Sequence, residues 1–302
     1  MKGILPPYAP ASIVLGSLSL AGTVVLHLTL PPDTGLYLHG GSWIYPSPLG
    51  RALGAAGGYA GLAFLTALCA TLLPWVVYNL ADSSGRDPLK AAWGIVKFPA
   101  AWYLFAVSID AVAAFFLVLA MTTKSRKIAL LSLAFAPMFH MALLPSALAI
   151  AAIKYLRGVA AFLAVALCGA LAFSYMVATP YGVLVSRHVN FLTLIWTGAA
   201  TFIVGILPVI ARKLSRQTFP MDGLFLTSMV VCTIGGMEAA IQQHFQPRYC
   251  LAGAILLAAA IAPDLRSFYV YEGGARFTKD SSPFRAGMTA NPKGGEKIEA
   301  HA

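Results

Sequence analysis

The chain has 302 residues, of which 59% are hydrophobic and 11% are charged. A soluble domain carries roughly 25% charged residues, so this composition excludes an ordinary soluble protein and indicates a membrane protein. The net charge is +10, but the basic residues lie in short segments between apolar runs, which is the pattern of topology signals and argues against nucleic-acid binding.

Apolar runs follow one another along the chain, and most are long enough to cross a bilayer as a helix. A transmembrane barrel would show shorter segments of alternating hydrophobicity. We therefore predict an all-α, polytopic helical membrane protein with about 8–10 membrane segments. The first run is interpreted as a retained span, because no convincing small-residue cleavage site is present. The runs cover residues 11–30, 53–80, 91–121, 128–153, 158–179, 191–211, 223–242 and 249–263.

The segment 31–51 is the first outer loop of this prediction. It interrupts the apolar sequence with polar and aromatic residues, among them Asp33, Tyr37 and His39. A carboxylate here could take a proton from an acceptor hydroxyl at the boundary between water and membrane. Asp33 could equally be an ordinary turn residue, since it follows two prolines. We expect this loop to cap a polar site at one membrane face.

Two of the runs are predicted to be short hairpins that return to the face from which they enter. Asp110 lies near the middle of 91–121, where a charged side chain would be costly in the bilayer, so we predict a turn there. Run 128–153 carries Pro137, His140 and Pro145 near its centre, and proline breaks helices. With these hairpins, most lysines and arginines lie on one side of the membrane. That side is predicted to be the cytoplasm, with both termini inside and the chain in the inner membrane of the cell envelope.

The same topology places most histidines and three acids, Asp33, Asp110 and Glu238, in or near the outer half of the membrane. Intramembrane ionisable residues are functional candidates. Asp110 could be a second carboxylate beneath the first loop, or an acid that stabilises the start of the following helix. His140 could belong to the site or be a hydrogen-bonded packing residue.

A further group of polar residues follows the run 223–242. Glu238 and Gln242 are four positions apart and share a helix face. An arginine at the outer face, such as Arg248, is suited to a phosphate, although an arginine–glutamate structural pair is an equal alternative. His244 lies between these positions, and Arg187 with His188 offers a second outer basic pair.

No motif predicts a cofactor. The sequence has no Walker A loop, no GxSxG and no GxGxxG, and its histidines lack metal-ligand spacing, so a divalent cation has no support. The four cysteines form no CxxC and are interpreted as packing residues. Residues 1–263 are predicted to form the membrane domain. Residues 264–302 are predicted to be a disordered, basic cytoplasmic tail that contacts membrane lipids.

Three stretches of the chain resemble the GT-C superfamily of polytopic membrane glycosyltransferases, which take a sugar from a polyprenyl-phosphate carrier. They are SIDAVAAFFL at 108–117, the basic turn and LSLAFAPMFHMALLPSALA at 124–149, and QPRYCL at 246–251. The family usually has more spans and a longer first outer loop, so the chain resembles a minimal or diverged member.

The resemblance implies hexosyl or pentosyl transfer from a polyprenyl-phosphate-linked sugar to a glycan, lipid or protein acceptor. It implies Asp33 as the catalytic base, with Asp110 beside it, and an outer arginine at the phosphate. The predicted substrate-binding residues are Tyr37, His39, His140, Arg187, His188, Glu238, His244, Arg248 and Tyr249.

Other classes stay open from the sequence. A small transporter, or a non-enzymatic membrane protein that binds a partner, would use the same acids and histidines along a proton or solute path. A membrane acyltransferase is a third reading, but no His–Asp motif of fixed spacing supports it.

Overall fold

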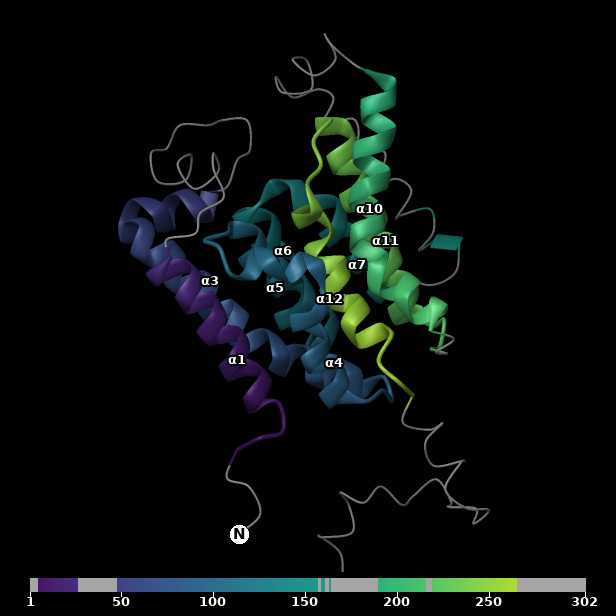
Figure 1. Cartoon of the computed structure of the whole chain (residues 1–302), viewed down its shortest axis with the longest axis horizontal. Coiled ribbons are helices and arrows are strands. Elements are labelled where there is room, and N and C mark those ends of the chain that lie inside the picture. The colour runs from purple at the N-terminus through teal and green to yellow at the C-terminus, as the bar shows by residue number, and fades with distance from the viewer. Residues whose placement is uncertain are drawn as a thin grey trace, which may run out of the picture. The chain divides into compact units, whose positions relative to one another are not determined.

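The computed structural model describes residues 5–26, 48–156, 159–160, 163, 190–215 and 219–264. Over these residues the regular elements are helices, which confirms the all-α prediction. Figure 1 shows their arrangement. The elements are α1 (Ala9–Leu20), η1 (Ala21–Val25), α3 (Pro48–Ser83), α4 (Pro88–Gly94), η2 (Ile95–Lys97), η3 (Pro99–Leu104), α5 (Ile109–Thr122), α6 (Arg126–Phe139), η4 (Met141–Leu143), α7 (Leu144–Tyr155), α10 (Phe191–Leu214), α11 (Gly223–Gln242), η5 (Pro247–Cys250) and α12 (Leu251–Ala260).

Three helices of the described part are long and apolar enough to cross a membrane, judged by length and composition. They are α10, α11 and the stretch Ala52–Ser83 of α3. Shorter apolar helices accompany these three. This agrees with a polytopic membrane protein, because a bilayer core of about 30 Å needs roughly 20 helical residues.

The predicted breaks at Asp110 and His140 are both present. Short 3-10 turns and the extended residue Ser108 separate α4 from α5, which begins at Ile109. Helix α6 ends at Phe139, His140 is extended with φ −146° and ψ 106°, and α7 starts at Leu144. Pro137 fits inside the last turn of α6, so the helix ends after this proline and not at it.

Helices α5, α6 and α7 pack against one another, and the turns that join them lie at two opposite ends of the group. At one end, Asp110 and His140 meet. At the other, Lys154 in the last turn of α7 donates a hydrogen bond to the Thr123 carbonyl, just after α5, over 2.8 Å. Since α5 and α7 both run from the first end to the second, α6 returns between them, as the hairpin prediction requires.

The core is built around α12. Each of its residues from Leu251 to Ala260 is buried, and it contacts α3, α4, α5, α10 and α11. Alanine and glycine let these neighbours approach closely. A Cβ added at Gly253 would lie 2.7 Å from the backbone nitrogen of Cys232 on α11. Helix α12 therefore fixes the position of η5, which directly precedes it and carries Arg248.

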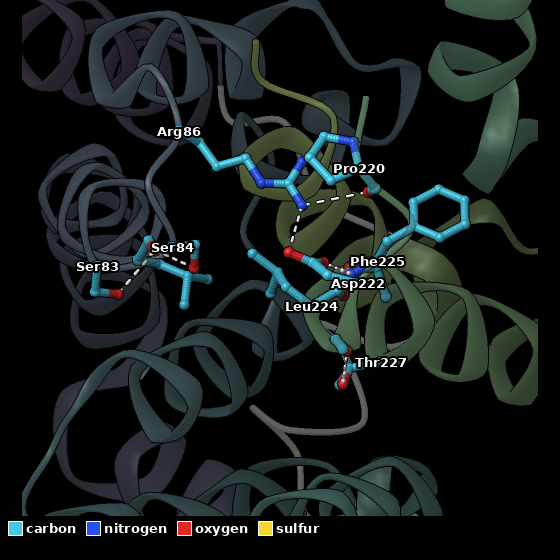
Figure 2. A network of polar contacts seen from close by, with 11 residues as sticks. Ser83, Ser84, Arg86, Pro220, Asp222, Leu224, Phe225 and Thr227 are labelled. Atoms are coloured by element: carbon cyan, nitrogen blue, oxygen red, sulfur yellow. Dashed lines mark hydrogen bonds and ion pairs between the residues drawn. The ribbon is translucent and has the colours of Figure 1, made fainter. Parts of the chain in front are cut away.

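A cluster at the far end of α12 joins three parts of the chain. The buried Arg86, just after α3, donates to the Asp222 carboxylate over 2.7 Å and to the Pro220 carbonyl over 3.4 Å, as Figure 2 shows. Backbone contacts pair Arg86 with Asp264, and Asp87 with Pro263. We call Arg86 and Asp222 the basal pair.

Asp222 caps the N-terminus of α11 by accepting from the Phe225 backbone N–H over 3.0 Å. Helix α11 has 20 residues and is therefore about 30 Å long. Gln242 is its last residue, so the basal pair and the Gln242 end lie about one membrane thickness apart.

Contacts between residues divide the chain into Met1–Leu265 and Arg266–Ala302. The predicted tail, apart from Asp264, lies outside the described residues.

Candidate functional site

Asp110 lies in the first turn of α5, where the positive end of the helix dipole favours a carboxylate. The preceding residue, Ser108, is held on α3 by Thr66. The Thr66 hydroxyl accepts from the Ser108 backbone N–H over 3.3 Å and contacts the Ser108 carbonyl at the same distance. The Ser108 hydroxyl donates to Oδ2 of Asp110 over 3.4 Å. The carboxylate is thus fixed from its own helix and from α3.

Two further side chains reach Asp110 from other elements. His140, at the break between α6 and α7, places Nδ1 2.5 Å from Oδ1 of Asp110. Arg248, in η5, places Nη1 3.5 Å from Oδ2. The three side chains are between 5% and 11% exposed. We call Asp110, His140 and Arg248 the Asp110 triad.

The Asp110 triad has a clear chemical consequence for the imidazole. A carboxylate at Nδ1 favours the tautomer with a proton on Nδ1, which leaves Nε2 as a basic nitrogen. The same carboxylate stabilises the imidazolium that forms when Nε2 takes a proton. The arginine adds a permanent positive charge beside this acid–base pair.

Tyr249 links the Asp110 triad to α11. Its ring stacks on His140 with centroids 6.2 Å apart and planes 26° apart. The Arg248 guanidinium lies 5.3 Å from the centre of the same ring, within the range of cation–π attraction. The Tyr249 hydroxyl donates to Oε1 of Gln242 over 2.6 Å. Glu238, one turn before Gln242, is completely buried.

The chain bends sharply to bring Tyr249 back against α11. Gln243 adopts a left-handed conformation with φ 52° at the end of α11, which is a usual helix stop. Gly235 then allows the backbone of η5 to touch α11. A Cβ at Gly235 would lie 2.6 Å from the carbonyl carbon of Tyr249 and 2.9 Å from the nitrogen of Cys250.

The structure brings five of the predicted site residues together: Asp110, His140, Glu238, Arg248 and Tyr249. Arg248 forms an ion pair with Asp110. The alternative considered from the sequence is a structural pair of Arg248 with Glu238. His244 is exposed on the turn after α11. Predicted residues Asp33, Tyr37, His39, Arg187 and His188 lie outside the described residues.

Thr66 was not predicted, because a single threonine in an apolar run carries no sequence signal. Within the described ranges, no group of three or more His, Cys, Asp or Glu residues is arranged to hold a metal ion.

No protein-family model, curated protein or solved structure matches this chain.

Proposed function

We propose that the chain is a membrane glycosyltransferase that moves a sugar from a polyprenyl-phosphate carrier to an acceptor hydroxyl at the outer face. The observation that carries this proposal is the Asp110 triad. An acid–base pair and an arginine converge from three separate elements, at one end of a bundle of apolar helices. Glycosyl transfer from a lipid phosphate needs both a base for the acceptor and a cation for the phosphate.

His140 is the proposed base for the acceptor. The acceptor oxygen attacks the anomeric carbon as its proton passes to Nε2 of His140, and the bond between the anomeric carbon and the phosphate oxygen breaks. Asp110 keeps the imidazole oriented and offsets its new positive charge.

Arg248 is the proposed partner of the phosphate. The leaving polyprenyl phosphate takes the bonding electron pair and gains a negative charge, which a nearby guanidinium stabilises. A guanidinium has five N–H donors and matches phosphate oxygens in pairs, so it can bind phosphate while it stays beside Asp110. The apolar helices around the site suit a donor that arrives from the bilayer.

A transfer assay tests the proposal. The purified chain is reconstituted with a radiolabelled polyprenyl-phosphate hexose and candidate acceptors. His140→Gln is expected to lower the rate at least about 100-fold, because general-base catalysis is lost. Arg248→Lys keeps the charge but loses paired hydrogen bonding, so we expect weaker use of the donor.

Asp33→Asn belongs in the same assay, since the resemblance implies Asp33 as the base. Loss of transfer in Asp33→Asn with a normal rate in His140→Gln would move the base to Asp33. Absence of transfer by the unaltered chain with every donor and acceptor would contradict the proposal itself.

A proton-coupled transporter is the second candidate, and Glu238 is the observation that favours it. This acid is fully buried within a candidate span, and neither carboxyl oxygen has a hydrogen-bond partner among the described residues. A transport path also needs polar groups toward the opposite face. In the first half of α11, the buried polar residues are Thr227 and Ser228, whose hydroxyls bond to their own helix backbone. This favours the one-sided site of a transferase.

A further inference from the structure

Glu238 and Gln242 present polar atoms that the described residues do not satisfy. Both oxygens of Glu238 and Nε2 of Gln242 are buried and have no hydrogen-bond partner in the described part of the chain. Glu238 is 0% exposed and Gln242 is 5% exposed. Buried polar atoms are nearly always paired, so three such atoms within one helical turn need a partner other than the described residues.

The orientation of Gln242 is fixed by a neighbour. Its Oε1 accepts from the buried Tyr249 hydroxyl over 2.6 Å, so its Nε2 is the group left to donate. Glu238 lies four residues earlier on the same face of α11. The two side chains therefore offer the two carboxyl oxygens of Glu238 beside one N–H donor from Gln242.

The position of these atoms relates them to the Asp110 triad. Tyr249 bonds to Gln242 at its hydroxyl and stacks on His140 with its ring. Asp110 and Glu238 are close enough for their charges to interact. A molecule that reacts at His140 and Arg248 would thus have its neighbouring groups near Glu238 and Gln242.

We propose that Glu238 and Gln242 form the subsite for the sugar ring, and that they bind two adjacent hydroxyl groups of a neutral sugar. The two hydroxyls donate to the two oxygens of Glu238, and Nε2 of Gln242 donates to one hydroxyl oxygen. An acidic sugar is disfavoured, because its carboxylate would lie near two other acids, Glu238 and Asp110. This inference rests on the proposed glycosyl transfer and names its substrate class.

Binding to the full-length protein tests the subsite without need of an acceptor. Thermal unfolding is measured with polyprenyl phosphate alone, with polyprenyl-phosphate hexose and with polyprenyl-phosphate uronic acid, since a ligand of the folded state raises the unfolding temperature. The hexose donor should bind the unaltered chain about tenfold or more tighter than the bare carrier. The uronic acid donor should show no such gain.

Glu238→Gln replaces one acceptor oxygen by a donor and should remove most of the gain from the hexose. Thr233→Val, at an exposed position of α11, is the matched control and should keep it. If Glu238→Gln keeps the full preference for the hexose donor, the subsite is wrong while the transferase proposal stands. If neither the carrier nor any donor stabilises the unaltered chain, both are wrong. Because Glu238→Gln conserves size, folding is checked by its unfolding temperature without ligand.

Discussion

At the scale of single residues, Asp110 is a buried acid with several partners. A buried ion is stable only with partners, and Asp110 has the helix N-terminus, the Ser108 hydroxyl, His140 and Arg248. By contrast, Lys90 and Asp87 form an i,i+3 pair at 3.5 Å in which the lysine side chain is 53% exposed. Such exposed pairs contribute about 0–1 kcal/mol.

Asp110→Asn is predicted to destabilise the fold by about 3 kcal/mol, because the charge of Arg248 stays buried without its carboxylate. The free energy of unfolding is measured in detergent by chemical denaturation. Lys90→Gln serves as the comparison and should change it by less than about 0.5 kcal/mol. Equal effects of the two substitutions would mean that the Asp110 triad adds nothing to stability.

The basal pair should make stability depend on acid pH. Burial by itself would raise the pKa of Asp222, but hydrogen bonds from the Phe225 backbone N–H and from Arg86, with the charge of Arg86, lower it below the ordinary 3.8. A lowered pKa in the folded state stabilises the fold above pH 3.8, and the benefit is lost as pH falls through the lower, folded value.

Asp222→Asn tests this dependence, because asparagine still caps the helix but carries no charge. The variant should be less stable than the unaltered chain near pH 6, and the difference should shrink as pH falls below 3.8. Unfolding in denaturant over a pH series measures it. A difference that stays constant with pH would show that the charge of Asp222 is not what stabilises the contact with Arg86.

At the scale of elements, glycine decides how closely η5 approaches α11. Gly235 has no room for a Cβ because the Tyr249 carbonyl lies against it, whereas Gly223 on the same helix has nothing within 4 Å of that position. The close approach at Gly235 sets the position of Tyr249, and with it Arg248.

Gly235→Ala is therefore predicted to destabilise the protein by roughly 1–3 kcal/mol, because the backbone must move. It should also lower transfer activity by displacing Arg248. Gly223→Ala, the matched control, is expected to be neutral within about 1 kcal/mol. Unfolding in detergent and the transfer assay give both readouts. Normal stability of Gly235→Ala would mean that this contact is not close in the protein.

The sequence predicted the helix ends that are indicated by residues close to them in the chain. Asp110 indicates a helix break because a charged side chain is costly inside an apolar run. His140 indicates a second break because it lies between two prolines, which lack a backbone N–H donor. The contacts of Thr66 with Ser108 could not be predicted, because they join residues 42 positions apart in the chain. The kink at Gly58, with φ 55° and ψ −151°, and the π turn of η1 were also missed, since glycine and small residues occur throughout these spans.

At the scale of the whole membrane domain, polar side chains gather at two separated ends. The Asp110 triad, with Gln242 and Tyr249, lies at the C-terminal end of α11, and the basal pair lies at its N-terminal end. From the distribution of lysine and arginine we expect the end with the basal pair to lie in the cytoplasm, because charge in loops decides which end stays there, and this stays a prediction. The sequence does not show which of these polar side chains are in contact with one another, because those contacts depend on the packing of helices that are distant in the chain.

The central prediction, that the Asp110 triad lies toward the outer face and the basal pair toward the cytoplasm, is tested most directly by labelling in intact cells. His244→Cys and Leu89→Cys place a thiol at exposed positions beside the two ends. The unaltered chain is the blank, since its described cysteines are buried. A membrane-impermeant maleimide should label position 244 in intact cells, and position 89 only after permeabilisation. Labelling of both positions from one side, or of position 89 alone in intact cells, would contradict the account.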